Sequence, residues 1–133
     1  MYSPKKILIV DDDPDDVDLF YEAVREVDPT ADCISKKDGD QALDFLNAEG
    51  IKLPDFIFLD LNMPRLNGIQ CLAQIKKIKK LSHIPVIIYS TTRRMGDEEE
   101  SKKLGAIYFL TKPTNFSDIC NAIRFILDRK YET

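Results

Sequence analysis

Four short apolar runs constrain the fold of this chain more than any other feature of its sequence. They cover residues 7–10 (ILIV), 56–59 (FIFL), 86–89 (VIIY) and 107–110 (IYFL). Each run is continuously apolar and rich in β-branched or aromatic residues, a pattern typical of strands that are covered on both faces. A weaker strand is expected around residues 33–35. Strands of this kind predict a parallel sheet.

Helical patterns lie between these runs. Apolar residues recur at helical spacing in four segments. The first has Asp13 as its N-cap and Pro14 as its first residue. The others begin after Asp38-Gly39, after Asn67-Gly68 and at Phe116, the last ending near Arg129. A further helix is expected over residues 96–104, with Gly105 ending it. Its sequence, GDEEESKKL, offers little apolar surface, so we expect it to be the most loosely held helix. The alternation predicts an α/β fold, a doubly wound (βα)5 chain with helices on both faces of the sheet.

Size and composition limit the classes of function. The chain has 133 residues, of which 44% are hydrophobic and 32% charged, a balance that fits one globular domain. No apolar run approaches the ~20 residues needed to cross a bilayer, and the cysteines show no paired spacing. We therefore expect a cytoplasmic protein without membrane association. The net charge of −4 disfavours nucleic-acid binding.

Polar side chains gather where the expected strands end. Ligands of an open parallel sheet bind at the carboxyl ends of its strands. The residues found there are Asp11, Asp12, Asp60, Ser90, Thr91 and Lys112. Three carboxylates packed together repel one another unless a cation neutralises them, and a small all-oxygen donor set favours Mg²⁺. The ammonium of Lys112 would balance charge and bind an anion such as phosphate.

The other aspartates between residues 11 and 18 have simpler interpretations. Asp13 fits a helix N-cap, Asp15 and Asp16 suit the positive end of the helix, and Asp18 fits plain surface. An EF-hand is excluded, because its sixth position requires Gly and the sixth residue from Asp11 is Asp16. The sequence leaves open whether the bond between Lys112 and Pro113 is cis.

Four stretches of the sequence resemble the receiver domain of bacterial response regulators, the CheY-like family. They are ILIVDDD, FIFLDLNMPRLNG, IPVIIYST and GAIYFLTKP, in the order and spacing of that family. The resemblance covers nearly the whole chain. It implies a single stand-alone receiver domain over residues 1–133, with a core from about residue 5 to residue 129 and no output domain. It also implies a flavodoxin-like sandwich whose sheet has the strand order 2-1-3-4-5.

The resemblance assigns a metal and an acceptor. Asp60 corresponds to the phospho-acceptor, which also binds the metal. Asp12 corresponds to a direct ligand of Mg²⁺ (or Mn²⁺), and Asp11 to a carboxylate that acts largely through metal-bound water. Asn62 would contribute its backbone carbonyl to the metal.

The same resemblance assigns phosphate-binding and switch residues. Lys112 corresponds to the phosphate-binding lysine, and Ser90 to the switch hydroxyl that closes onto the phosphoryl group, with the N–H of Thr91 beside it. Phe109 stands at the position of the rotating aromatic switch. Asn62 and Thr92 occupy positions that help set the dephosphorylation rate. Neither is an acid or a base, so we expect no rapid assistance to hydrolysis.

The implied function is a response regulator rather than an enzyme with its own substrate. A histidine kinase or a phosphotransfer protein would donate a phosphoryl group to Asp60 in a Mg²⁺-dependent reaction. The signal would leave through protein contacts on the face made by the helix over residues 96–104, the strand over residues 107–110 and the helix that begins at Phe116. A homodimer through that face is an open alternative.

Two rival functions fit the residues less well. A haloacid-dehalogenase-type phosphatase needs a second Asp two positions after its nucleophile, where this chain has Asn62. An interaction module that is never phosphorylated would lack one or more of the site residues, and all of them are present.

Overall fold

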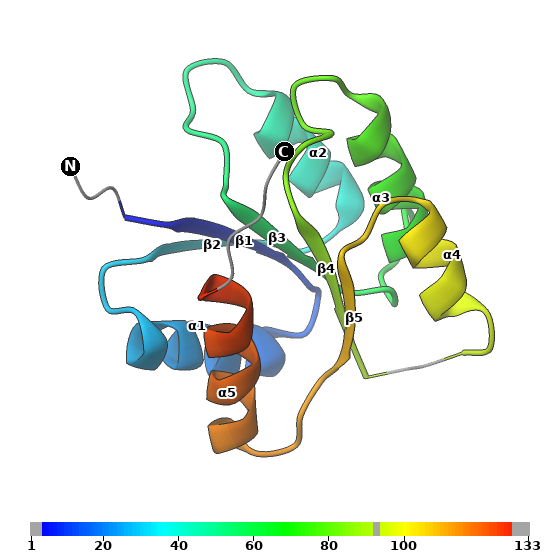
Figure 1. Cartoon of the computed structure of the whole chain (residues 1–133). Helices are drawn as coiled ribbons and strands as arrows, with labels where there is room; N and C mark the ends of the chain where they lie inside the picture. Colours follow the sequence, from blue (N-terminus) through cyan, green and yellow to red (C-terminus); the bar gives the residue numbers. More distant parts are fainter. Residues whose placement is uncertain (1–3, 92–93, 129–133) are drawn as a thin grey trace.

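The computed structural model describes residues 4–91 and 94–128. In chain order its elements are β1 (Lys6–Val10), α1 (Pro14–Val27), β2 (Asp32–Lys36), α2 (Gly39–Asn47), β3 (Phe56–Leu59), α3 (Gly68–Lys77), β4 (Val86–Ser90), α4 (Asp97–Lys103), β5 (Tyr108–Thr111) and α5 (Phe116–Leu127). The strands pair in parallel in the order β2-β1-β3-β4-β5 (Figure 1). The predicted α/β class and the strand order implied by the resemblance are both confirmed.

Four of the five described helices begin with a side-chain cap, and the cap of α1 is the predicted Asp13. The Asp13 carboxylate accepts hydrogen bonds from the N–H groups of Asp15 and Asp16 at the start of α1. Asn67 and Gln70 form a reciprocal capping box at the start of α3. These bonds satisfy N–H groups that have no partner inside the helix, which fixes the first residue of each helix.

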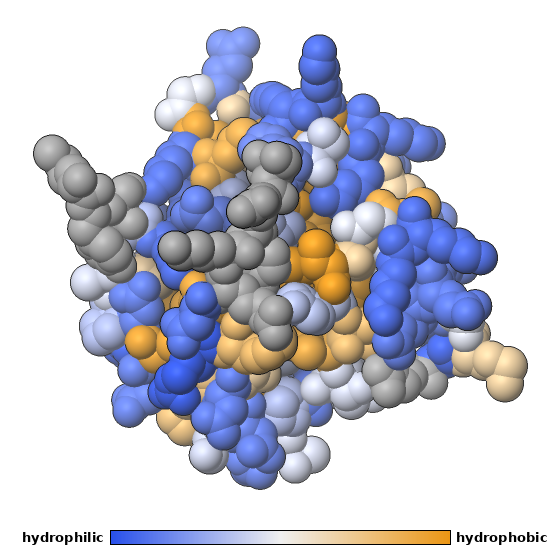
Figure 2. All heavy atoms as spheres, in the orientation of Figure 1, coloured by the Kyte–Doolittle hydropathy of each residue, from blue (hydrophilic) through white to orange (hydrophobic). Residues whose placement is uncertain are grey.

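The helix α4 differs from the others in how it starts and packs. It begins after Gly96 without a side-chain cap, and its one buried residue is Ser101. Figure 2 shows hydrophilic side chains over most of its outer surface. It ends at Lys103, one residue before the predicted end, with Leu104 as its C-cap and Gly105 next in the left-handed conformation (φ +108°), as predicted. The last helix, α5, ends at Leu127, and the expected end near Arg129 lies outside the described residues.

The sheet separates two apolar cores. Strands β1, β3 and β4 are buried along their whole length, as their continuous apolar runs predict. Alternate residues of each strand point to opposite faces. One core joins one face of the sheet to α2 and α3, and the other joins the opposite face to α1 and α5 (Figure 1). With both faces covered, the ends of the strands stay open to ligands.

Two further features bear on the predictions. No peptide bond in the described part of the chain is cis, so the bond between Lys112 and Pro113 is trans. No helix among the described residues is both long enough and apolar enough to cross a membrane.

Candidate functional site

The carboxyl ends of the strands bring together three residues that lie far apart in the sequence. Asp11, Asp60 and Lys112 directly follow β1, β3 and β5. Backbone hydrogen bonds fix where each side chain starts. Asp60 N–H donates to the Val10 carbonyl at 3.0 Å, and Lys112 N–H donates to the Ser90 carbonyl at 2.9 Å. The sheet itself therefore sets the positions of the acidic and basic groups.

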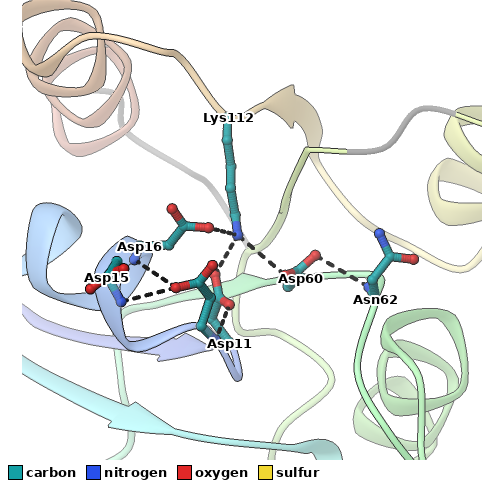
Figure 3. Close-up of polar contacts among 7 residues, drawn as sticks. Asp11, Asp15, Asp16, Asp60, Asn62 and Lys112 are labelled. Carbon is teal, nitrogen blue, oxygen red and sulfur yellow. Dashed lines mark hydrogen bonds and ion pairs between the residues drawn. The ribbon is translucent and has the colours of Figure 1, made fainter.

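Lys112 is the cation at the centre of the site. Its Nζ lies 2.6 Å from Asp11 Oδ2, 2.8 Å from Asp16 Oδ2 and 3.2 Å from Asp60 Oδ2 (Figure 3). The Lys112 side chain is only 6% exposed, so these ion pairs are shielded from solvent. The ammonium also lies over the ring of Tyr89, 5.8 Å from the ring centre. Three carboxylates and one aromatic ring hold the ammonium in place.

Asp60 is buried and oriented by its neighbours. Its other oxygen, Oδ1, accepts a hydrogen bond from the N–H of Asn62 at 3.2 Å (Figure 3). The helix α3 begins at Gly68, directly against the backbone of Asp60. A Cβ on Gly68 would lie 2.3 Å from the Asp60 carbonyl oxygen, closer than real contacts allow, so glycine is required there. The backbone that carries Asp60 is thus fixed by β3 on one side and by the start of α3 on the other.

The carboxylates of Asp11, Asp12 and Asp60 fit a divalent cation. Each can offer an oxygen, and these oxygens lie within 4.8 Å of one another. Asp12 is exposed, which leaves the group open to solvent on one side. Asp11 Oδ2 is buried and, apart from its close ion pair with Lys112, has no well-directed hydrogen bond, so it keeps a lone pair for a ligand. An all-oxygen set of this size suits Mg²⁺ or Mn²⁺, both of which keep bound water.

Burial and nearby charges shift the pKa values of Asp11 and Lys112. Burial raises the pKa of Asp11 to about 6, and the Asp60 carboxylate adds to the rise, although contacts with Lys112 and the Asp13 N–H oppose it. Burial alone would lower the pKa of Lys112, but its contacts with Asp11, Asp16 and Asp60 more than offset that and hold the pKa above its ordinary value. Lys112 therefore stays charged, and the site carries more negative than positive charge.

The remaining predicted site residues lie around this group. Ser90 is fully buried at the end of β4, and Thr91 follows it at the surface. Phe109 pairs with Ile88 across β4 and β5 and packs in the core on the side of α2 and α3. Phe109 is thus part of that core rather than one of the polar groups around Lys112. Thr92 lies outside the described residues.

Asp16 is the residue of this site that the sequence interpretation missed. Its place in the first turn of α1 was explained by the helix dipole, yet its carboxylate pairs with Lys112. The available signal was that α1 starts only two residues after Asp12, so its first turn must lie at the same end of the sheet. Asp15, beside it, is exposed as the helix-terminus interpretation predicts.

Comparison with known proteins assigns this chain to a family. The model of the response regulator receiver domain matches residues 7–124. The response regulator Rcp1 of Synechocystis sp. is 33% identical over 127 residues, covering 92% of this chain and 86% of Rcp1. A protein-glutamate methylesterase/protein-glutamine glutaminase of Methanococcoides burtonii is 37% identical over 120 residues. That match covers 86% of this chain but only 31% of the relative.

Solved structures agree with the sequence comparison. The phosphorylated cyanobacterial phytochrome response regulator RcpA superposes with a TM-score of 0.85 at 32% identity, covering 93% of this chain and 91% of that chain. The Mn²⁺-bound form of Rcp1 superposes with a TM-score of 0.82 at 33% identity, covering 92% and 91%. The acidic pocket of Asp11, Asp12 and Asp60 fits the phosphorylation site of such proteins. The chain belongs to the response regulator receiver domain family.

Proposed function

We propose that Asp60 accepts a phosphoryl group from the phosphohistidine of a histidine kinase or a phosphotransfer protein. An oxygen of the Asp60 carboxylate forms a bond to phosphorus as the bond between phosphorus and the donor imidazole nitrogen breaks. The observation that carries this proposal is the environment of Asp60. One carboxylate oxygen faces Lys112 at 3.2 Å, the other is held by the Asn62 N–H, and two more carboxylates lie alongside.

The chain's own residues supply position and charge for this transfer. Asp11, Asp12 and Asp60, with the Asn62 carbonyl, would hold Mg²⁺, which neutralises negative charge on the phosphoryl oxygens when bound. Lys112 binds a further phosphoryl oxygen. Positioning and charge neutralisation account for most of the catalysis in phosphoryl transfer. Asn62 and Thr92 offer no acid or base for hydrolysis, so the product is stored rather than turned over.

The phosphorylated site then signals through protein contacts. The new phosphate adds charge and strong hydrogen-bond acceptors, to which the Ser90 hydroxyl and the Thr91 N–H move. That movement draws in the loop after β4 and biases α4 and the packing of Phe109, a two-state change. The proposed output face is made by α4, β5 and α5, for a protein target or a second copy of the chain. We propose that residues 1–133 act as a receiver in the cytoplasm, where free thiols such as that of the buried Cys71 stay reduced.

Intact mass spectrometry after incubation with acetyl phosphate and Mg²⁺ tests the proposal. The wild type should gain the mass of one phosphoryl group, and Asp60→Asn should gain none. Asp18→Asn is the matched control, because it removes an exposed carboxylate from α1 and should leave the gain unchanged. No adduct on the wild type at any Mg²⁺ concentration would contradict the proposal, and so would an adduct that survives in Asp60→Asn.

A further inference from the structure

Asp16 holds Lys112 from the side opposite Asp60. The Lys112 ammonium lies between the two carboxylates, 2.8 Å from Asp16 and 3.2 Å from Asp60 (Figure 3). Asp16 comes from α1, whereas Asp60 follows β3. The Lys112 ammonium is therefore fixed between a helix and a strand end, not simply drawn toward Asp60.

The three carboxylates around Lys112 differ in what else they can bind. Asp11 and Asp60 belong to the group whose oxygens come together for a divalent cation, and Asp16 does not. A cation bound there takes up the negative charge of Asp11 and Asp60 and places a like charge near the ammonium. Asp16 is the one ion-pair partner of Lys112 among the described residues that would keep its full charge for the lysine.

The fold does not need Asp16 for another purpose. Asp13 already caps α1 through its side chain, and Asp15 supplies a negative charge to the same helix turn. The Asp16 side chain is 30% exposed, so it fills no space in a core. Its carboxylate is nevertheless turned toward Lys112 rather than toward solvent, at a distance typical of a charge-assisted hydrogen bond.

We propose that Asp16 is a positioning residue, which keeps the Lys112 ammonium in the pocket when a divalent cation occupies Asp11, Asp12 and Asp60. The inference rests on the proposed function in that Lys112 is there to bind a phosphoryl oxygen on Asp60. Without Asp16, the cation would release the ammonium from its other two partners. The lysine would then leave the pocket for solvent, and the incoming phosphoryl group would meet no positioned cation.

The ammonium signal of Lys112 in ¹H–¹⁵N NMR spectra tests this without any phosphorylation. Lysine ammonium protons are observed when ion pairs slow their exchange with water, and the signal is assigned by its loss in Lys112→Met. The wild type should keep the signal both without metal and with saturating Mg²⁺. Asp16→Asn should keep it without metal, through Asp11 and Asp60, and lose it with Mg²⁺. Asp15→Asn, which removes the same charge from the same turn, should behave as the wild type.

Three outcomes of that measurement would overturn the inference. The first is an Asp16→Asn signal that survives saturating Mg²⁺. The second is an equal loss of the signal in Asp15→Asn, which would indicate a general effect of charge. The third is a wild-type signal that is absent either without metal or with Mg²⁺. Because no phosphoryl donor is present, these outcomes are independent of the mass test on Asp60.

The rate of phosphoryl uptake from acetyl phosphate gives a second readout. It is measured with Mg²⁺ raised until the rate no longer increases, so that weaker metal binding by a variant does not contribute. Asp16→Asn should react about tenfold more slowly than the wild type, as expected for loss of one charge-assisted hydrogen bond. Asp15→Asn should react at the wild-type rate. Equal rates for the wild type and Asp16→Asn would overturn the inference.

Discussion

At the scale of single residues, Asp11 is a site carboxyl group whose ionisation is opposed by burial. It is 2% exposed, and burial raises its pKa to about 6. In the unfolded chain the pKa returns to 3.8, so between these two values the folded state binds more protons. The contribution of Asp11 to the stability of the metal-free protein therefore falls as the pH rises from about 4 to about 6. A bound cation reverses that cost, because it favours the ionised form.

The raised pKa of Asp11 predicts that protons compete with Mg²⁺. One pH unit below a pKa of about 6, only about one in ten Asp11 side chains is ionised, so Mg²⁺ should bind about tenfold more weakly near pH 5 than near pH 7.5. Isothermal titration calorimetry at the two pH values measures the difference. In Asp11→Asn the affinity should be lower throughout and should change much less with pH. An equal pH dependence in that variant would assign the competing proton to another group.

The residues of this site differed in how well the sequence predicted them. Asp11 and Asp60 were predicted because each directly follows an apolar run, and Lys112 because it lies two residues after one; the ends of parallel strands must meet at one edge. Asp16 was missed because a residue in the first turn of a helix already has a sufficient explanation in the helix dipole. Which way its side chain turns depends on where Lys112 lies, and that is a contact across 96 residues of sequence.

At the scale of elements, the approach of α3 to β3 is the closest contact that the site requires. Gly68 and Gly39 are both the first residue of a helix, and both are buried. They differ in what an added Cβ would meet. At Gly68 it would meet backbone atoms of Asp60 and Leu61, and at Gly39 the side chain of Leu66. A side chain can move to another rotamer, whereas the backbone of Asp60 is held by the hydrogen bond from its N–H to Val10 of β1.

Replacing these two glycines by alanine should therefore have unequal effects. Gly68→Ala should lower the free energy of unfolding by about 2–3 kcal/mol, as overpacking against a fixed backbone does, and should slow phosphoryl uptake by Asp60. Gly39→Ala should cost under about 1 kcal/mol, since only the Leu66 side chain has to move. Urea unfolding and acetyl phosphate labelling of both variants provide the comparison. Equal losses would show that the contact between α3 and Asp60 is not tight.

The observed ends of a strand agree with the predicted ones where neighbouring residues in the sequence alone determine them. The predicted run 56–59 is β3 without change, because polar residues bound it on both sides. The run 107–110 shifted by one residue, since β5 starts at Tyr108. There Ile107 already donates its N–H to the Val86 carbonyl at 2.9 Å. Pairing at that edge depends on where β4 starts, which the sequence of the run does not contain.

At the scale of the whole molecule, Lys112 links the site to the core beneath it. Its ammonium lies over Tyr89, whose ring packs edge-on against Phe20 and Phe58 in the core on the α1 and α5 side. The same ammonium joins α1 to the ends of β1 and β3. One buried cation thus contacts α1, β4 and the ends of β1 and β3. Its removal should therefore lower the stability of the entire fold.

Lys112→Met keeps most of the length of the side chain but removes that charge, leaving the carboxylates of Asp11, Asp16 and Asp60 without a counter-ion. The metal-free variant should lose on the order of 3 kcal/mol of unfolding free energy near neutral pH, as when one partner of a buried ion pair is removed. The loss should shrink toward pH 5, where protonation relieves the repulsion, and Mg²⁺ should restore more stability to the variant than it adds to the wild type.

Lys102→Met is the control. Its ion pair with Glu98 is exposed, so it should cost about 0.5 kcal/mol at most. Urea unfolding at both pH values, with and without Mg²⁺, measures all four quantities. A Lys112→Met protein as stable as the wild type without metal would show that the acidic group does not need this cation to fold.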